Sequence, residues 1–212
     1  TAVPILRAFT LNPQEYLRPI LSRVSSLETP LPGSPLGLFF KNLLGALGIV
    51  NWSNHSSWVD GIPLRPAVDW LTAALFILGI IIVLVEYHKR KDWSLLALVV
   101  LYPVLLLPSV LSLAFPAENP SLSRALGAAL PVFMLAALGL YTLGKAILAA
   151  LRTKRPLSRV LLVGILSIMI VWQNSQAIFY TYPQTYRQNA WNASEMGKVI
   201  TQTRQNFGGL GG

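Results

Sequence analysis

The chain has 212 residues, of which 53% are hydrophobic and 12% charged, and its mean hydropathy is +0.54. Soluble domains carry about 25% charged residues, so this composition excludes an ordinary water-soluble domain and indicates a membrane protein. The net charge is +9, and many of the basic residues lie in short tracts between apolar runs, which is typical of membrane topology and not of nucleic-acid binding. The lack of cysteine excludes disulfides and thiolate metal sites. Because the chain begins with Thr1 and shows no signal peptide, we expect it to be part of a longer protein.

The first predicted element is a surface helix near the N-terminus. Asn12 followed by Pro13, with Glu15 in the first turn, has the form of a helix start: a capping side chain, a proline and an acidic residue. Apolar residues then recur at helical spacing as far as Leu27. We therefore expect an amphipathic helix here, bent at Pro19.

A connector and a short apolar segment follow this helix. Residues 28–35 hold three prolines and a glycine, which predicts a turn-rich connector. Residues 36–50 are apolar except for Lys41 and Asn42, but fifteen residues are too few to cross a bilayer comfortably. We interpret this segment as an interfacial or re-entrant helix, and a fifth, tilted span is the alternative.

Four apolar runs approach the length of about 20 residues that a membrane-spanning helix needs. Pro103 and Pro108 should bend the second run, and Pro131 should kink the third. The fourth run ends in four polar residues, 173–176, which we expect to face neighbouring helices, with a lipid-phosphate groove as the alternative. The four predicted spans are residues 70–85, 94–115, 125–144 and 160–180.

The loops of this four-helix region, residues 68–180, predict its orientation. Two loops, 86–92 and 152–159, are rich in Lys and Arg, whereas the loop 116–124 between them has a single basic residue, Arg124. The positive-inside rule then places residues 86–92 and 152–159 in the cytoplasm, and residues 1–67, 116–124 and 181–212 outside. We expect a multi-pass protein of the cell (inner) membrane.

The C-terminal residues 181–212 are expected to begin an outer domain that continues beyond this chain. Apolar residues from Met196 to Phe207 repeat at three and four positions, which predicts an amphipathic helix. The expected fold class is therefore an all-α integral membrane protein, with about four transmembrane helices plus interfacial and outer helices. We expect it to form part of a larger multi-span bundle.

The outer loop before the third span is the first candidate site. Asn119 is expected to cap that span, so that the amides of Ser121 and Ser123 open toward the outer face. Helix N-termini attract anions, and Arg124 lies on nearly the same side as Ser121, so these residues would form a cradle for a phosphate. The alternative is that Asn119 is only a cap and that Arg124 pairs with Glu118 or extends to the interface.

The second candidate site lies between residues 51 and 66. His55, Trp58, Asp60 and Arg65 occur there in a stretch rich in Ser and Asn. Aromatic rings beside polar groups suit a sugar or a lipid headgroup. The alternative is that His55 is simply a hydrogen-bonded loop residue, and the spacing does not suggest a metal site.

Several segments together resemble a known enzyme family. They are Thr29-Pro-Leu-Pro-Gly33, Asn51-Trp-Ser followed by Ile62-Pro-Leu-Arg-Pro66, Phe115-Pro-Ala-Glu-Asn-Pro-Ser-Leu-Ser-Arg124, and Tyr186-Arg-Gln-Asn-Ala-Trp-Asn-Ala-Ser194. In this order they resemble the C-terminal half of bacterial polyprenyl-phosphate-dependent membrane glycosyltransferases. The type is that of the protein O-mannosyltransferases and aminoarabinose transferases, family 39 of the C superfamily.

The resemblance implies an enzyme that moves a sugar from a polyprenyl-phosphate carrier to a protein or lipid acceptor at the outer face. Such enzymes place their catalytic acid in a loop near the N-terminus, which this chain does not contain, so no catalytic residue is assigned here. Arg124 and Arg65 would offset charge on the departing phosphate. The implied partners are the bilayer, the lipid-linked sugar donor, the acceptor and the missing N-terminal helices, with no cofactor, metal or nucleic acid.

A non-enzymatic membrane protein is the alternative to the glycosyltransferase. It would be half of a transporter or an assembly scaffold. The lack of internal symmetry and of ionisable side chains in mid-membrane does not favour a transporter.

Overall fold

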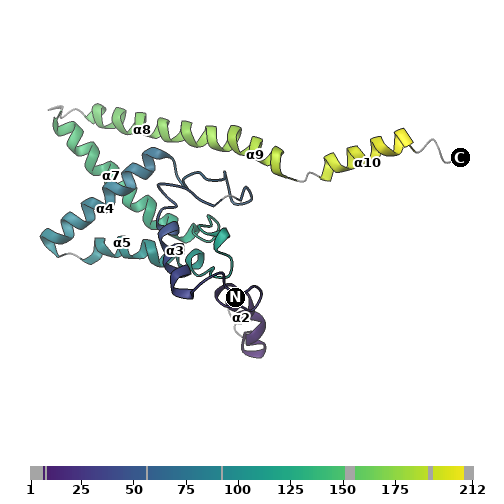
Figure 1. Cartoon of the computed structure of the whole chain (residues 1–212). Helices are drawn as coiled ribbons and strands as arrows, with labels where there is room; N and C mark the ends of the chain where they lie inside the picture. The colour runs from purple at the N-terminus through teal and green to yellow at the C-terminus, as the bar shows by residue number, and fades with distance from the viewer. Residues whose placement is uncertain are drawn as a thin grey trace.

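The computed structural model describes residues 7, 9–55, 57–91, 93–150, 156–190 and 193–207. Within these residues all regular secondary structure is helical, which confirms the expected all-α class. Figure 1 shows the arrangement. In chain order the helices are α2 (Pro13–Val24), α3 (Pro35–Leu47), α4 (Trp70–Arg90), α5 (Trp93–Leu105), α6 (Leu107–Val110), η1 (Pro116–Glu118), η2 (Leu126–Ala128), α7 (Ala129–Ala150), α8 (Pro156–Gln176), η3 (Ala177–Thr181), α9 (Tyr182–Asn189) and α10 (Ala193–Phe207).

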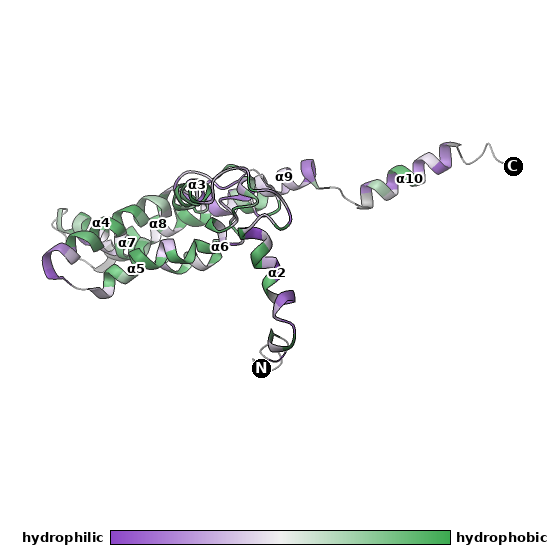
Figure 2. Cartoon of the chain, turned by 60° about the horizontal axis from the view of Figure 1, so that its bottom comes forward, coloured by the Kyte–Doolittle hydropathy of each residue, from purple (hydrophilic) through white to green (hydrophobic). Residues whose placement is uncertain are grey.

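Four stretches of helix in the described part of the chain are long and apolar enough to cross a membrane. They agree with the four predicted spans, although the boundaries differ, and Figure 2 shows how apolar they are along most of their length. The protein is therefore an all-α membrane protein. The spans are Trp70–Arg90, Trp93–Val110, Leu126–Ala150 and Val160–Asn189.

The first span extends five residues beyond the predicted end. An ion pair of 2.9 Å between Glu86 and Arg90, one helical turn apart, supports this last turn. Basic side chains there also interact favourably with the negative end of the helix dipole. The helix stops at Lys91, whose φ of 56° is incompatible with helical continuation.

The second span is interrupted, as the two prolines predict. Pro103 lies inside α5, and Pro108 lies in the first turn of α6 after the break at Leu106. The helix ends at Val110 and not at Phe115. The residues that follow turn back across the end of the bundle, where the Ala114 amide donates to the Arg23 carbonyl over 2.9 Å.

The bundle core forms where α4 crosses α7. Gly79 and Gly139 bring the two backbones so close that a Cβ atom at either position would collide with the carbonyl oxygen of Leu135 or Leu75. Small residues allow two membrane helices to approach this closely. Their association relies on close packing, because the hydrophobic effect does not drive it in lipid. The core cluster that includes this crossing contains the large, fully buried apolar side chains of Phe76, Val83, Leu106, Val110 and Leu135.

The bundle has two chemically distinct ends. At the basic end, α4 turns into α5 and α7 leads toward α8 (Figure 1). Residues 152–155 of the predicted basic loop 152–159 lie outside the described residues. At the other end, which we call the loop end, residues 48–69 and 111–128 gather together with α3 (Figures 1 and 2). All candidate site residues named from the sequence lie at the loop end.

The two N-terminal helices form as expected but with local differences. Helix α2 begins at Pro13, yet the Asn12 side chain makes no capping hydrogen bond. Helix α3 has 13 residues and begins at Pro35, and the side chain of the preceding Ser34 caps it by accepting from the Gly37 amide. Because 13 residues fall short of the roughly 17 needed, α3 is not a fifth span. Buried Asn42 holds it in place by donating to the Val110 and Ser112 carbonyls.

The fourth span continues beyond its predicted end at Tyr180. Helix α8 passes through the π-helical segment η3 into α9, and this continuous helix runs from the basic end back to the loop end (Figure 1). The predicted C-terminal amphipathic helix is α10, which stands away from the bundle (Figure 1).

Candidate functional site

Two loops that are distant in sequence meet at the loop end and hold the candidate residues. The backbone amide of His55 donates to the Pro120 carbonyl over 3.1 Å, and the Ala67 amide donates to the Ile49 carbonyl over 2.8 Å. The bond between His55 and Pro120 places the second predicted site against the first, and the bond between Ala67 and Ile49 closes the loop of the second site. The polar side chains there form two clusters and one cavity.

The first cluster, which we call the Asp60 cluster, consists of His55, Asp60, Ser121 and Ser123. One carboxylate oxygen, Asp60 Oδ2, accepts from His55 Nε2 at 3.1 Å, Ser121 Oγ at 3.0 Å and Ser123 Oγ at 3.1 Å. His55 Nδ1 accepts from the Ser57 amide over 2.7 Å, so the ring proton resides on Nε2 in the neutral form. His55 is therefore a hydrogen-bonded loop residue, as the alternative interpretation stated.

The Asp60 carboxyl is held in its charged form. Burial alone would raise its pKa, but the hydrogen bonds from His55, Ser121 and Ser123 outweigh burial and leave the pKa below its ordinary value of 3.8. Such a carboxylate is a weak proton acceptor at neutral pH. The cluster therefore serves to join the two loops, and its negative charge disfavours an anion beside Ser121 and Ser123.

The predicted helix cap at Asn119 is wrong. Its side-chain amide donates to the Asn42 carbonyl over 2.8 Å, and its Oδ1 accepts from Ser109 Oγ over 2.7 Å. The third span begins several residues later, at Leu126, and the Ser121 amide donates to Ser109 Oγ over 3.0 Å. The proposed phosphate cradle of unpaired amides at a capped helix start is therefore absent from this loop.

Arg124 belongs to a second group, the Glu118 cluster, formed by Arg23, Glu118 and Arg124. The Arg124 guanidinium pairs with Glu118 and also donates to Ser112 Oγ over 2.9 Å. The same Glu118 oxygen accepts from Arg23 Nη1 over 2.9 Å. The alternative stated for Arg124, pairing with Glu118, is therefore the one the structure confirms.

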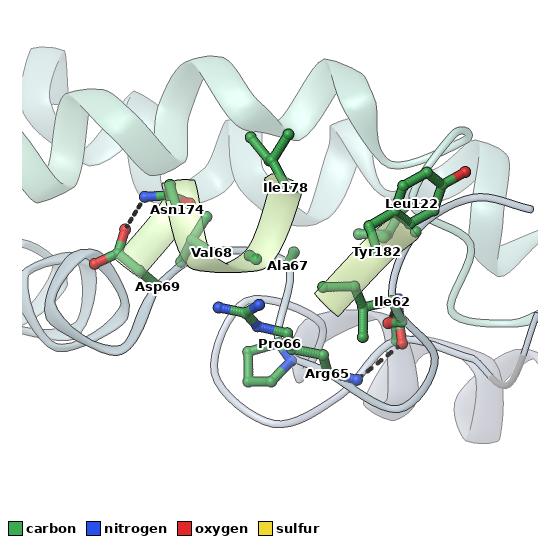
Figure 3. Close-up of a pocket in the computed structure, with 13 residues that line it drawn as sticks. Ile62, Arg65, Pro66, Ala67, Val68, Asp69, Leu122, Asn174, Ile178 and Tyr182 are labelled. Carbon is green, nitrogen blue, oxygen red and sulfur yellow. Dashed lines mark hydrogen bonds between the residues drawn. The ribbon is translucent and has the colours of Figure 1, made fainter. Parts of the chain in front are cut away.

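Arg65 lines a separate cavity of about 290 Å³, which we call the Arg65 cavity (Figure 3). Two backbone bonds to Asn54 fix its position: the Asn54 amide donates to the Arg65 carbonyl, and the Arg65 amide donates to Asn54 Oδ1. Among the described residues, no side chain forms an ion pair with its guanidinium. Figure 3 shows this group turned toward the Asp69 side of the cavity. The cavity is lined by Asn54, Gly61, Ile62, Arg65, Pro66, Ala67, Val68, Asp69, Leu122, Asn174, Ala177, Ile178 and Tyr182.

The opposite wall of the Arg65 cavity comes from the fourth span. Asn174 donates to Asp69 Oδ2 over 3.2 Å. Asp69 is buried and caps α4 by accepting from the Thr72 amide over 2.9 Å. The prediction that residues 173–176 face a neighbouring helix is thus confirmed for Asn174, whereas the Gln173 amide bonds the Met169 carbonyl of its own helix.

The sequence analysis missed Asp69 and Asn174 as parts of one site. A signal existed for Asp69, because an Asp followed three residues later by Thr72 at the start of an apolar run is typical of a helix cap. The sequence contains no comparable signal for Asn174, because its partner lies 105 residues away.

An apolar pocket of about 230 Å³ adjoins the Arg65 cavity. The two share Ala67, Val68 and Leu122, so the Arg65 cavity, whose lining includes a few polar side chains, adjoins a pocket lined by apolar residues. The remaining lining comes from residues such as Ile49, Val50, Ala129, Val132 and Phe133.

The residues predicted for a sugar site do not line the Arg65 cavity. His55 and Asp60 are engaged in the Asp60 cluster, and the Trp58 ring packs edge-on against Tyr186 of α9 with centroids 5.7 Å apart. The second predicted site is therefore divided, with Arg65 on the cavity and the other three residues beside it.

Within the described part of the chain, no three His, Asp or Glu side chains come together in a way that could hold a metal ion.

Comparison with known proteins found no family model, no curated protein and no solved structure that matches this chain.

Proposed function

We propose that this chain forms the lipid-phosphate side of a multi-span membrane glycosyltransferase, and that the Arg65 cavity binds the phosphate of a polyprenyl-phosphate-linked sugar. The observation that carries the proposal is the Arg65 guanidinium, which lines a cavity at the end of the spans without an ion-pair partner among the described residues. A guanidinium presents a planar fork of donors that matches phosphate oxygens.

The phosphate role falls to Arg65 and not to Arg124. Glu118 already offsets the charge of Arg124, and Ser112 takes a further donor of that guanidinium. Arg65 forms no ion pair among the described residues, and the same cavity also holds the Asn174 amide together with the Asp69 carboxylate that it bonds. The remaining sequence-predicted residues, Ser121, Ser123 and Asn119, support the loop through their hydrogen bonds.

The apolar pocket next to the cavity supports an amphiphilic ligand. A lipid phosphate needs a polar place for its head and an apolar place for the first units of its chain. The two cavities share three wall residues, which puts such places side by side. The exposed apolar surface of α8, including Ile165 and Ile168, would accommodate the rest of the chain within the bilayer.

The proposed orientation places the loop end outside the cell membrane and residues 86–92 and 152–159 in the cytoplasm, following the distribution of Lys and Arg. In the reaction, an acceptor hydroxyl replaces the phosphate oxygen on the sugar carbon, and Arg65 offsets the charge on the departing phosphate. The base that removes the hydroxyl proton would come from a part of the protein outside this chain. The acceptor would be a protein or a lipid.

Binding of a polyprenyl phosphate to the full chain in phosphatidylcholine nanodiscs tests the proposal. We expect Arg65→Gln to weaken binding at least tenfold, because hydrogen bonds to a charged group contribute about 1.5–3 kcal/mol and about 1.4 kcal/mol corresponds to a tenfold change. Arg204→Gln on α10 removes the same charge far from the cavity and is the matched control.

Two further comparisons sharpen this experiment. The corresponding polyprenol, which lacks the phosphate, should bind with the same affinity to the Arg65→Gln variant and to the unmodified chain. Arg124→Gln should leave phosphate binding within about threefold of the unmodified chain, a difference of about 0.6 kcal/mol. Equal affinity of the Arg65→Gln and Arg204→Gln variants for polyprenyl phosphate would refute the phosphate site.

A further inference from the structure

Helix α2 contacts the protein through polar residues of its last turn, Ser22 and Arg23, and its apolar side is uncovered. Ser22 is 3% exposed, whereas Leu17, Ile20 and Leu21 are 39%, 59% and 48% exposed. At about 100° per residue, Ser22 lies on roughly the opposite face of the helix from these three residues. An amphipathic helix on a water-soluble protein shows the reverse arrangement, with its apolar stripe turned to the core.

Specific contacts fix α2 in this orientation. Arg23, in its last turn, pairs with Glu118 at 2.9 Å, and its guanidinium lies 4.4 Å from the centre of the Phe115 ring. The Ala114 amide also donates to the Arg23 carbonyl. The polar side of α2 is therefore attached to the loop that follows the second span, and its apolar side points away from that loop.

The position of α2 relative to the spans indicates what covers its apolar side. Figure 2 shows α2 leaving the loop end of the bundle and running across the direction of the spanning helices. A bundle whose spans cross a bilayer places its end at the boundary between headgroups and acyl chains. A helix that leaves this end across the spans extends along that boundary.

The neighbouring helix α3 shows the same exposure at the same end. Leu36, Phe40 and Leu44 recur every four residues and are all exposed, while Asn42 on another face is buried against the bundle. Two consecutive helices at the loop end thus each present an apolar stripe that no described residue covers. Lipid adjoins the spans at this depth around the bundle, which favours lipid over a protein partner as the occupant.

We propose that α2 is an interfacial helix that lies on the bilayer at the loop end, with Leu17, Ile20 and Leu21 inserted into the boundary between headgroups and acyl chains. Amphipathic helices bind membranes in this way, with their polar side facing water or protein. Arg18, next to this stripe, extends its charged end toward the headgroups. The proposal concerns the membrane contact alone and does not depend on the proposed enzyme activity.

The lack of cysteine in the chain makes a direct test simple. Single cysteines at exposed positions, Ile20→Cys on the apolar side and Glu15→Cys on the polar side, are labelled with a fluorophore in the full chain. The labelled proteins are reconstituted in phosphatidylcholine vesicles, and quenching by brominated phosphatidylcholine is compared with quenching by aqueous iodide. Ile165→Cys on the exposed face of α8 gives the reference value for full contact with lipid.

We expect brominated lipid to quench the Ile20 label at least twofold more than the Glu15 label, with iodide showing the opposite order. Equal quenching of the two labels by iodide would overturn the proposal, because it would place both sides of α2 in water. Protection of the Ile20 label from both quenchers would also overturn it, because a protein surface would then cover the helix. The labels replace exposed side chains, so loss of folding does not confuse the result.

Discussion

The side-chain amide of Asn174 on α8 lies 3.2 Å from the carboxylate of Asp69, the residue that caps α4. This bond joins the fourth span to the first at the rim of the Arg65 cavity. The fourth span needs such a connection, because no residue of its most apolar stretch is buried within the described structure. One polar pair thus positions a helix that apolar packing holds only weakly.

Replacing Asn174 with Leu should loosen α8 without unfolding the bundle. Hydrogen bonds between membrane helices contribute about 0.6 kcal/mol on average, so we expect a loss of about 0.5–1 kcal/mol in unfolding free energy. Hydrogen exchange of the α8 and α9 amides in nanodiscs should rise, while exchange of α4 stays the same. Gln173→Leu is the control, because that amide bonds only within its own helix. Equal exchange in both variants would show that the Asn174 contact does not hold α8.

The close crossing of α4 and α7 should not tolerate a methyl group. In Gly79→Ala or Gly139→Ala, the new Cβ would collide with a backbone carbonyl of the opposite helix, which cannot move as a side chain does. Overpacking of this kind lowers the unfolding free energy by about 1–3 kcal/mol. Thermal unfolding in detergent measures the loss. Gly164→Ala on α8 meets nothing within 4 Å and should be neutral or slightly stabilising.

Removing the charge of Glu118 should release α2. In Glu118→Gln, Arg23 and Arg124 lose the carboxylate that they share, and two guanidinium groups remain close together. Because these groups are partly exposed, each pair contributes only about 1 kcal/mol or less. Trypsin should cut after Arg23, which Val24 follows, several times faster in this variant. Glu15→Gln removes an exposed acid that pairs with no described residue, and its cleavage rate should match that of the unmodified chain.

The Asp60 cluster should give the protein a defined dependence on acid. The pKa of Asp60 is lower in the folded protein than its ordinary value of 3.8, so its contribution to stability is complete above that value. The contribution disappears as the pH falls through the lower folded pKa. We expect Asp60→Asn to reduce the unfolding free energy by about 1 kcal/mol at pH 7, since the hydrogen bonds lose their charged acceptor.

Thermal unfolding of both proteins across the acidic range measures this effect. The difference in melting temperature between Asp60→Asn and the unmodified chain should shrink as the pH falls below 3.8 and through the lower pKa of Asp60 in the folded protein. Glu28→Gln, which removes an exposed carboxylate, should show no such change. A difference that persists undiminished at the lowest pH would show that the charge of Asp60 does not stabilise the contact between the loops.

Much of the fold follows from the order of residues along the chain. The four spans, the break near Pro103 and Pro108, and the two amphipathic helices at the ends were all predicted correctly in kind. These features depend on apolar length, helical periodicity and proline, which act over one helix at a time. The helix ends were less accurate, because local contacts such as Glu86 to Arg90 extend a helix beyond its apolar run.

The sequence by itself therefore determined that this protein is a helical membrane protein with its polar loops gathered near a set of span ends. Only the tertiary structure decided the roles of the residues within those loops. Asn119, expected to cap the third span, instead bonds Asn42 and Ser109. Arg124 pairs with Glu118, whereas Arg65 pairs with no acidic side chain in the part of the chain that the structure describes. A side chain at a loop takes the nearest partner in space, and that partner often comes from a helix or loop far away in sequence.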